Sequence, residues 1–428
     1  MKQKNAVILI VLLAVLLSFT AYGAYTSAPE YAPPMQWYTT YANRLSGFMY
    51  AFGARTSDGG YIVCGDDQIN PALWSSVIFK TDALGNVQWN LTLGGAHQFT
   101  LTDVYQTSDG GYIFAGVRNW AAFLVKISEK GVPEWNRTYG SFAFLAYVEQ
   151  TADSGYILAA QCSVFVSLLK TDSDGNPEWN GTYQEGSPVF VHQTGDGGYV
   201  VAGQDQEGRL LLLKTNATGT MIWNQTYETP ILYEYETSAC ATSTSDGGYI
   251  MAGVSSPGSF NPFTEKYPGS WNLELVKVDG NGTLVWQQTY GGDWDLGFLD
   301  ISALSVQQTS DGGYIVAGTA TGPSSNGYAE PVLLKMDEGG AVQWTKRNFG
   351  GSLSNGAFIF SVVPSSDGGY VFFGTSYGIP FIAKLAANPT FAPPSILFVS
   401  LFDAAGLELA AIVVLVVTVV THKARRGV

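Results

Sequence analysis

The chain has 428 residues, of which 46% are hydrophobic, 14% aromatic and only 13% charged. Its 35 acidic residues exceed its 21 basic residues and give a formal net charge of −14 at pH 7. Because binding to nucleic acid depends on neutralising phosphates with Lys and Arg, this charge excludes nucleic acid as an expected partner.

The chain begins with the pattern of an export signal. Lys2 and Lys4 precede an apolar run over residues 6–17, and the small residues Ala21 and Gly23 stand at the positions that a signal peptidase reads. The run is short for a spanning helix, which favours cleavage. We therefore predict a signal peptide over 1–23 and a Pro-rich, polar linker over 24–36.

Two motifs then recur. The first is Ser-Asp-Gly-Gly-Tyr or a close variant, which predicts a hairpin between two short β-rich runs. Its Asp stands at 58, 109, 153, 196, 246, 311 and 367. The second motif places a Lys nine residues before a Trp, with a Gly four residues before the Trp where a tight turn needs positive φ. Its Lys/Trp pairs are 80/89, 126/135, 170/179, 214/223, 277/286 and 335/344.

Each unit of roughly 50 residues therefore contains four expected strands, which is typical of a propeller blade. Seven Asp-Gly-Gly turns predict an all-β, seven-bladed β-propeller over residues 37–385. Only six Trp follow a Lys, because Pro393 stands nine residues after Lys384. We predict that the N-terminal strand beginning at Trp37 completes the seventh blade and closes the ring. The alternative is a three-stranded last blade, with Trp37 in a linker.

The repeated residues have structural explanations. One Trp per repeat predicts aromatic packing between neighbouring blades. The seven Lys are expected to be solvated strand residues that pair with turn Asp of another blade. Cys64, Cys162 and Cys240 stand in different repeats and are expected to be small buried residues without disulfides. The three His, at 97, 192 and 422, are too scattered for a His-rich metal site, and His192 is expected to be structural.

One loop resembles a calcium site. Asp172 and Asp174 supply alternate carboxylates followed by a Gly, which can surround a hard cation with oxygen. The other copies keep a turn-forming residue and the Gly but lack the second acid, so a turn capped by its own side chain explains all of them. We expect no other cofactor and retain calcium as an alternative at this loop alone.

Six Asn-x-Ser/Thr sequons suggest glycosylation. In four of them the Asn follows the Trp, so it points outward if the Trp is buried. Glycans there would protect the outermost strands from edge pairing, whereas the alternative is a repeated polar residue without a sugar. The candidate residues are Asn90, Asn136, Asn180, Asn216, Asn224 and Asn281.

The composition changes beyond the repeats. A Pro-rich linker over 386–395 precedes a mostly apolar segment over 396–421, and the basic residues of 422–428 end the chain. About 20 residues span a bilayer, and basic residues mark its cytoplasmic side. We predict a single-pass membrane protein with an extracellular propeller, a transmembrane helix over 396–421 and a cytoplasmic tail over 422–428. A buried helix of a soluble protein is the alternative.

The repeat also resembles known propellers. The combination Ser-Asp-Gly-Gly-Tyr-Ile-x-Ala-Gly, Leu-x-Lys-x-Asp-x-x-Gly-x-x-x-Trp and Thr-Tyr-Gly-Gly is similar to the repeat of secreted or surface-anchored propeller proteins of archaea and bacteria. The Asp-x-x-Gly-x-x-x-Trp portion is similar to the tryptophan-docking repeat of quinoprotein-type propellers, which implies a Trp packed between blades. The sequence lacks the adjacent Cys pair of those dehydrogenases, so the resemblance does not extend to quinone chemistry.

Length variation predicts where a ligand binds. The Lys-to-Trp interval is constant, whereas the interval from the turn Tyr to the Lys ranges from 14 residues (Tyr112 to Lys126) to 28 (Tyr249 to Lys277). All of this variation falls on one face, and loops on a rigid scaffold usually carry binding residues. Aromatic residues beside carboxylates there suit sugar stacking or a peptide or protein partner. The candidates are Phe260, Phe263, Tyr267, Trp271, Trp294, Tyr328, Tyr233 and Tyr235.

These patterns favour a monomeric, cell-surface binding or interaction module for an extracellular glycan, peptide or protein, without catalysis. The enzymatic alternative is a polysaccharide hydrolase or lyase that uses Asp293, Asp295 or Asp300, because paired carboxylates are the minimum for that chemistry. The third alternative is a structural component of the cell envelope. In it the aromatic loops only pack on one another.

Overall fold

The computed structural model describes residues 32–41, 48–70, 73–94, 99–140, 143–227, 239–255, 272–290, 300–321, 330–347, 349, 353 and 356–387. The described residues from 32 to 386 belong to one compact unit. The predicted signal peptide (1–23), transmembrane segment (396–421) and tail (422–428) lie outside the described residues. Within the described ranges, no helix is long and apolar enough to cross a membrane.

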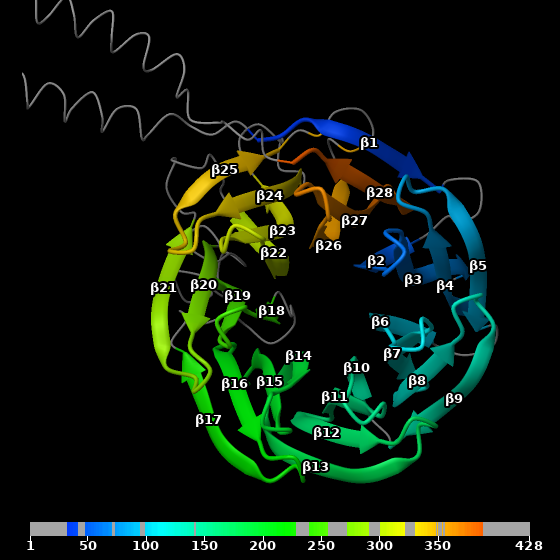
Figure 1. Cartoon of the computed structure of the whole chain (residues 1–428), viewed down its shortest axis with the longest axis vertical. Coiled ribbons are helices and arrows are strands. Elements are labelled where there is room, and N and C mark those ends of the chain that lie inside the picture. The colour runs from blue at the N-terminus through cyan, green and yellow to red at the C-terminus, as the bar shows by residue number, and fades with distance from the viewer. Residues whose placement is uncertain are drawn as a thin grey trace, which may run out of the picture. The chain divides into compact units, whose positions relative to one another are not determined.

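Seven four-stranded antiparallel sheets form the blades, and their innermost strands surround a common centre (Figure 1). Blade 1 contains β2 (Phe48–Arg55), β3 (Tyr61–Asn70), β4 (Leu73–Thr81) and β5 (Val87–Gly94). Blade 2 contains β6 (Phe99–Gln106), β7 (Tyr112–Arg118), β8 (Ala121–Ile127) and β9 (Pro133–Tyr139). Blade 3 contains β10 (Ala143–Gln150), β11 (Tyr156–Cys162), β12 (Phe165–Thr171) and β13 (Pro177–Glu185).

The remaining blades repeat this order. Blade 4 contains β14 (Ser187–Gln193), β15 (Tyr199–Gln204), β16 (Leu210–Thr215) and β17 (Met221–Tyr227). Blade 5 contains β18 (Cys240–Ser243), β19 (Tyr249–Ser255), β20 (Asn272–Val278) and β21 (Leu284–Tyr290). Blade 6 contains β22 (Asp300–Gln308), β23 (Tyr314–Thr321), β24 (Glu330–Met336) and β25 (Val342–Lys346). Blade 7 contains β26 (Ala357–Pro364), β27 (Tyr370–Ser376), β28 (Ile379–Leu385) and, from the other end of the chain, β1 (Met35–Thr40).

The N-terminal strand closes the ring. β1 pairs antiparallel with β28, with Trp37 opposite Lys384, so the two ends of the described chain share one sheet (Figure 1). Trp37 reaches the Gly85 turn of blade 1, where a Cβ on the glycine would lie 3.0 Å from its ring. The predicted all-β, seven-bladed architecture with N-terminal closure is confirmed, and the three-stranded alternative is wrong.

Each glycine of the Asp-Gly-Gly turn has its own physical reason. Gly59 adopts φ +84°, which a side chain rarely tolerates, and blade 3 instead places Ser154 there at φ +68°. Gly60 is required for space, because a Cβ would lie 2.1 Å from the Thr81 carbonyl oxygen and 2.6 Å from Lys80 Nζ. The first glycine therefore forms the turn, and the second makes room for a Lys behind the hairpin.

The prediction that these Lys are solvated and pair across blades is wrong. Lys80 is 2% exposed, and its Nζ lies 2.8 Å from the Asp58 carboxylate of its own blade and donates to the Thr81 carbonyl. A buried ammonium is stable only when such partners replace water, and the missing Cβ of Gly60 lets them approach. The equivalent pairs, at 2.6–2.8 Å, are Lys126–Asp109, Lys170–Asp153, Lys214–Asp196, Lys277–Asp246, Lys335–Asp311 and Lys384–Asp367.

The hydrophobic core is divided among the blade interfaces, with one buried cluster for each pair of neighbouring blades. The Trp ring of one blade covers the turn glycine of the next, as Trp89 covers Gly131. Trp89 also donates to the Glu129 carbonyl at 3.0 Å and contacts Tyr112 of blade 2 with a centroid distance of 5.9 Å. The predicted packing of Trp between blades is confirmed.

The cysteines are free. Cys64 and Cys240 are buried as predicted, whereas Cys162 is half-buried because it ends β11 beside a surface turn.

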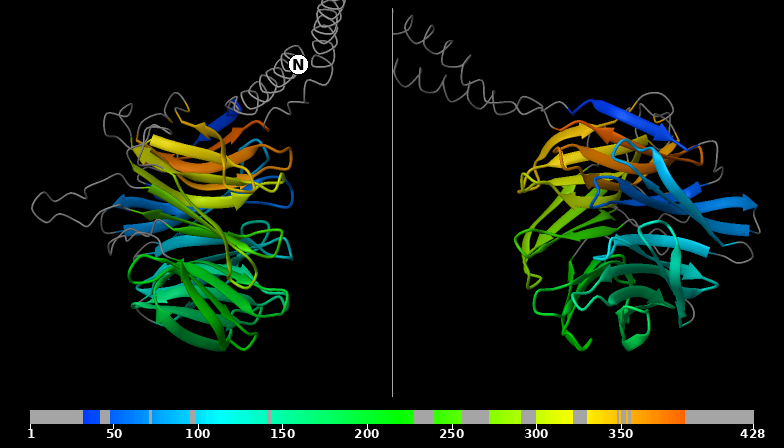
Figure 2. Two further views of the ribbon diagram at one scale, coloured as in Figure 1. Left: turned by 90° about the vertical axis from the view of Figure 1, so that its left-hand side faces the viewer. Right: turned by 45° about the vertical axis from the view of Figure 1, so that its right-hand side comes forward.

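The strand order assigns the hairpins to two faces, seen edge-on in Figure 2. The turn face carries the Asp-Gly-Gly hairpins and the Lys-to-Trp hairpins, such as 56–60 and 82–86 of blade 1. The loop face carries the connections from second to third strand, such as Asn119 and Trp120, and the links between blades. The long segments that the sequence analysis identified are connected to strands at the loop face: β19 ends there and β20 begins there.

Candidate functional site

A channel between the innermost strands is the main cavity in the described part of the chain. It consists of one cavity of about 460 Å³ and a second of about 430 Å³ that reaches the loop face. The two share Phe52, Thr102, Tyr147, Ala239, Leu304 and Phe360 in their walls, so they form one continuous space.

Two positions of the repeat line much of this space. In a strand, residues i and i+2 face the same side, and these positions lie six and four residues before each turn Asp. Their side chains vary from blade to blade, and only Ser in blades 6 and 7 occurs twice at the same position. The first set is Phe52, Asp103, Tyr147, Phe190, Cys240, Ser305 and Ser361, and the second is Ala54, Tyr105, Glu149, His192, Thr242, Gln307 and Val363. All of them except Ala54 and Val363 line the inner cavity.

Asp103 is the most perturbed acid on the channel wall. Its carboxylate accepts the backbone N–H groups of Val104, at 2.9 Å, and of Val148 in the next blade, also at 2.9 Å. Burial between the blades raises the pKa of Asp103 to about 6, against the two backbone hydrogen bonds that lower it, and the charge of Glu149 adds to the rise. A carboxylate with this pKa is mostly ionised at pH 7.

Glu149 and His192 continue the polar wall from blade 3 to blade 4. His192 Nδ1 lies 3.1 Å from the Glu149 carboxylate, which also accepts the Gln193 N–H at 3.0 Å. The His192 ring stacks on Phe190 at a centroid distance of 6.0 Å. His192 therefore links two blades, as the structural interpretation predicts, and it also faces the cavity.

Two aromatic side chains stand where the channel meets the loop face. Trp120, on the turn between β7 and β8, is 53% exposed, and Phe144, at the start of β10, is 49% exposed. Their rings contact edge to face at 5.6 Å, and the Trp120 carbonyl accepts the Ala143 N–H at 2.8 Å. Both side chains line the outer cavity, so an incoming group would meet them first.

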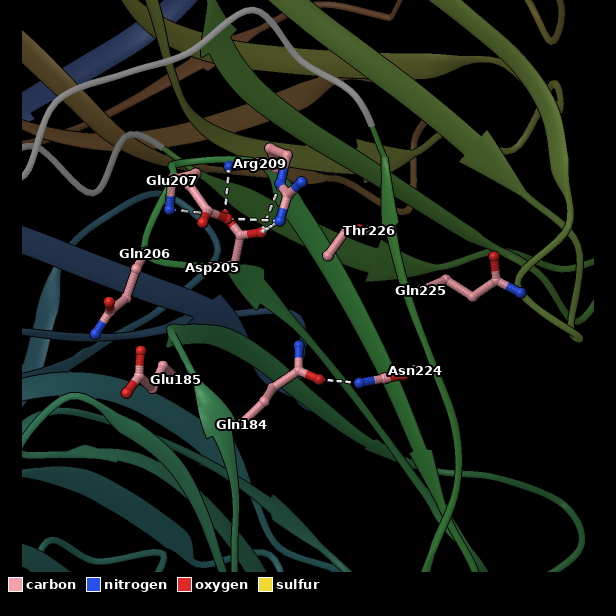
Figure 3. Close-up of a pocket in the computed structure, with 9 residues that line it drawn as sticks. All are labelled: Gln184, Glu185, Asp205, Gln206, Glu207, Arg209, Asn224, Gln225 and Thr226. Carbon is pink, nitrogen blue, oxygen red and sulfur yellow. Dashed lines mark hydrogen bonds and ion pairs between the residues drawn. The ribbon is translucent and has the colours of Figure 1, made fainter.

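A separate polar hollow of about 370 Å³ lies between blades 3 and 4 (Figure 3). Asp205 accepts the N–H groups of Glu207 and Arg209 and pairs with the Arg209 guanidinium at 2.7 Å, so it holds its own hairpin together. Asn224 points across the hollow and donates to Gln184 (Figure 3). These partners are already satisfied, which marks the hollow as a less suitable site than the channel.

The structure does not place the predicted ligand-binding residues. Phe260, Phe263, Tyr267, Trp271, Trp294, Tyr328, Tyr233 and Tyr235 all lie outside the described residues. Asp293 and Asp295, candidates for catalysis, also lie outside them, while Asp300 is the first residue of β22. These assignments stay predictions.

The candidate glycosylation residues are all described and all exposed: Asn90, Asn136, Asn180, Asn216, Asn224 and Asn281. Four of them follow a Trp that is turned inward, as the alternation of the strand predicts. Exposure is required for a glycan, and glycosylation itself stays a prediction.

The loop at Asp172 has the geometry of a capped turn. The Asp172 carboxylate accepts the N–H groups of Asp174 and Asn176 and the Asn176 side-chain amide, at 2.8–2.9 Å. Asp82 makes the same bonds in blade 1 without a second acid. Among the described residues no group of three His, Cys, Asp or Glu side chains could hold a metal ion. Calcium at Asp172 and Asp174 stays an untested alternative, and the cap explains the loop without it.

The channel residues cannot be identified from the constant positions of the repeat alone. Aligning the seven copies on their turn Asp would have shown that the two inner positions vary, with only Ser305 and Ser361 alike, while the turn Asp, the second glycine and the Lys are the same in all seven. The sequence could therefore have indicated the wall positions, but not which of them meet across the ring.

No protein-family model matches the sequence, and no curated protein sequence matches it. Among solved structures, BBS1N in complex with ARL6DN is similar with a TM-score of 0.51 and 12% identity, over 85% of this chain and 99% of that one. The chain is a β-propeller. Drosophila plexin A in complex with semaphorin 1b gives 0.48 and 8% identity, over 83% and 90% of the two chains. Streptogramin B lyase gives 0.47 and 12%, over 84% and 95%. The last two superpositions are too loose to support an argument, and at 12% identity the first shows the fold alone.

Proposed function

We propose that the protein is an interaction module, anchored at a cell surface, that binds a partner protein on its loop face. The observation that carries this proposal is the channel that opens beside Trp120 and Phe144, two aromatic side chains that remain about half exposed. Exposed aromatic groups at the rim of a cavity are typical of binding sites rather than of inert surface.

A second observation supports a protein partner. BBS1N, whose fold is similar to that of this chain with a TM-score of 0.51, was solved in complex with ARL6DN. Charge supports it as well, because a net charge of −14 disfavours nucleic acid and anionic lipid. A glycan, the other ligand that the sequence analysis predicts, is one of the outcomes that the test below distinguishes.

The cell-surface part of the proposal rests on the sequence. It combines the signal peptide over 1–23, the transmembrane segment over 396–421 and the resemblance to surface-anchored archaeal and bacterial propellers. The exposed sequon residues, among them Asn90 and Asn136, agree with export. Protease digestion of intact cells tests it: loss of the propeller with retention of a short C-terminal fragment is expected, and full protection would contradict it.

Site-specific cross-linking tests the binding face. A photoreactive residue at Asn119 on the loop face is compared with one at Ser108, which is exposed on the turn face of the same blade. On intact cells we expect a discrete protein adduct from Asn119 and none from Ser108. Equal adducts from both positions, or none from either, would overturn the proposal. A glycan-array hit that is lost in Trp120→Gly would replace the protein partner by a sugar.

No second function is proposed. The polysaccharide hydrolase or lyase requires Asp293, Asp295 or Asp300, and no contact of these carboxylates is described. A purely structural role in the cell envelope does not explain why Trp120 and Phe144 are exposed at the channel mouth.

A further inference from the structure

We infer that the channel receives a short basic segment of the partner protein, whose apolar groups pass Trp120 and Phe144 and whose lysine or arginine cation reaches Asp103 and Glu149. The inference rests on the proposed function and specifies the chemistry of its partner. Three features of the described residues lead to it: a strained aromatic turn, a change from apolar to acidic wall along the channel, and an acid where the fold needs none.

The first feature is the backbone at Trp120. Asn119 and Trp120 have φ of +51° and +63°, so the two-residue turn between β7 and β8 holds a bulky Trp in a conformation that favours glycine. The corresponding turn of blade 7 consists of Tyr377 and Gly378, with φ of +50° and +74°. A glycine thus serves the same turn elsewhere in the ring. Retaining an exposed Trp in the strained position indicates a role in binding.

The second feature is the gradient along the channel. The outer cavity is lined by apolar groups such as Val117, Leu304 and Phe360. The inner cavity adds the carboxylates of Asp103 and Glu149 and the imidazole of His192. Lys and Arg side chains combine an apolar stem with a cationic head, and their cations also interact favourably with aromatic faces. Phe144 and Glu149 are five residues apart on β10, about 16 Å along the strand at about 3.3 Å per residue. This length exceeds that of one side chain, so the order of groups matches a short segment whose apolar groups meet the mouth while its lysine or arginine meets the acids.

The third feature is the excess of acid on the wall. No Lys or Arg side chain lines either described cavity, and no ion pair of the described residues involves Asp103. His192 is the one basic group there, and it pairs with Glu149. Each Asp103 oxygen accepts one backbone N–H and can accept a further hydrogen bond. A cationic ligand would supply the missing partner.

A structural role alone does not require an acid at this position. Asp103 connects blades 2 and 3 by accepting the Val148 N–H. Ser305, at the same place in the repeat, connects blades 6 and 7 by accepting the Val362 N–H at 3.2 Å. A neutral hydroxyl therefore makes the same connection, and the negative charge of Asp103 serves another purpose. The comparison also supplies the variant Asp103→Ser, which keeps the connection and removes the charge.

The test measures binding of labelled pentapeptides to the full chain in a non-ionic detergent at pH 7.5. The peptides are acetyl-Ala-Leu-X-Leu-Ala-amide, with lysine, norleucine or glutamate as X. Norleucine matches the apolar stem of lysine without its charge. We expect the lysine peptide to bind about tenfold more tightly than the norleucine peptide and the glutamate peptide to bind most weakly.

Two variants separate the two ends of the channel. Trp120→Gly is expected to weaken the lysine and norleucine peptides alike by about tenfold while the melting temperature stays within about 3 °C, since glycine relieves the turn. Asp103→Ser is expected to abolish the advantage of lysine over norleucine. Tyr377→Gly removes an exposed aromatic residue from the matched turn of blade 7 and is the control that leaves all affinities unchanged.

Equal affinity of the lysine and norleucine peptides for the wild-type chain would overturn the inference, and so would a lysine preference that survives in Asp103→Ser. Glu149→Gln is a second variant in case Asp103→Ser does not fold. A partner protein that cross-links at Asn119 equally well in the wild type, Trp120→Gly and Asp103→Ser would overturn this inference and leave the proposed function standing.

Discussion

The turn face and the channel wall of this propeller differ in how they use the repeat. On the turn face, every blade places an Asp, a glycine and a Lys in the same arrangement, as Asp58, Gly60 and Lys80 do in blade 1, and the Lys is buried in all blades but the seventh. On the channel wall, the position occupied by Asp103 in blade 2 holds Phe52, Tyr147, Phe190, Cys240 or Ser in the others. Constant positions therefore maintain the scaffold, and the variable inner positions give the channel its chemistry.

The largest expected effect comes from breaking a constant position. Lys335 is fully buried and bonds to Asp311, the Met336 carbonyl and Gln343. Lys335→Ala is expected to lower the free energy of unfolding by about 3 kcal/mol, because it leaves a cavity and unpaired acceptors. Urea denaturation measures the change. Lys130→Ala, at an exposed Lys, is the control with an expected change below about 0.5 kcal/mol, and equal effects would show that the buried Lys is not structural.

The two glycines of one turn allow a sharper comparison. Gly60→Ala forces a Cβ against the Thr81 carbonyl oxygen and Lys80 Nζ and is expected to cost about 2 to 3 kcal/mol. Gly59→Ala meets no atom within 4 Å and bears only the strain of φ +84°, about 1 kcal/mol. Thermal unfolding of both variants measures which of them loses more stability. A larger loss of stability for Gly59→Ala than for Gly60→Ala would show that lack of space is not the reason for the second glycine.

Acid should weaken the turn face before the channel. Partial burial disfavours the ionised Asp109, but hydrogen bonds from Lys126, Thr107 and Gly111 outweigh it and hold the pKa of Asp109 at about 2. A depressed pKa contributes stability that is present above pH 4 and is lost as pH falls toward 2. Each contribution is modest, since the carboxylates are about half exposed. Circular dichroism between pH 5 and pH 2 should show the loss, and Asp109→Asn should make it smaller.

Asp103 should show the opposite dependence. Its pKa of about 6 is raised by burial, so its contribution to stability is greatest below pH 4 and is lost as pH rises through 6. The groups that face it across the channel wall include Glu149, His192, Tyr105 and Tyr147. Melting temperatures from pH 4 to pH 7.5 should therefore decline more steeply for the wild type than for Asp103→Ser. Parallel curves would place Asp103 in a solvated environment. This effect is the smallest expected.

The sequence alone determined the architecture, because it is built from local rules repeated seven times. Hairpins such as Asp58-Gly-Gly60 and the Trp-to-Gly packing at Trp89 follow from spacing, and the surplus Trp37 was sufficient to predict closure through β1. It did not reveal that the Lys are buried. Burial depends on the space that Gly60 leaves behind the folded hairpin, and the spacing of residues in the sequence does not predict that space.

The channel was decided by the tertiary structure. Asp103, Glu149 and His192 are more than forty residues apart from one another along the chain, and only closure of the ring brings their strands side by side. The sequence likewise does not identify Trp120, because the dipeptide Asn119-Trp120 does not predict a strained turn beside Phe144. Local patterns fix strands and hairpins, whereas a binding site made by several blades depends on contacts between distant segments, and those exist only once the ring has closed.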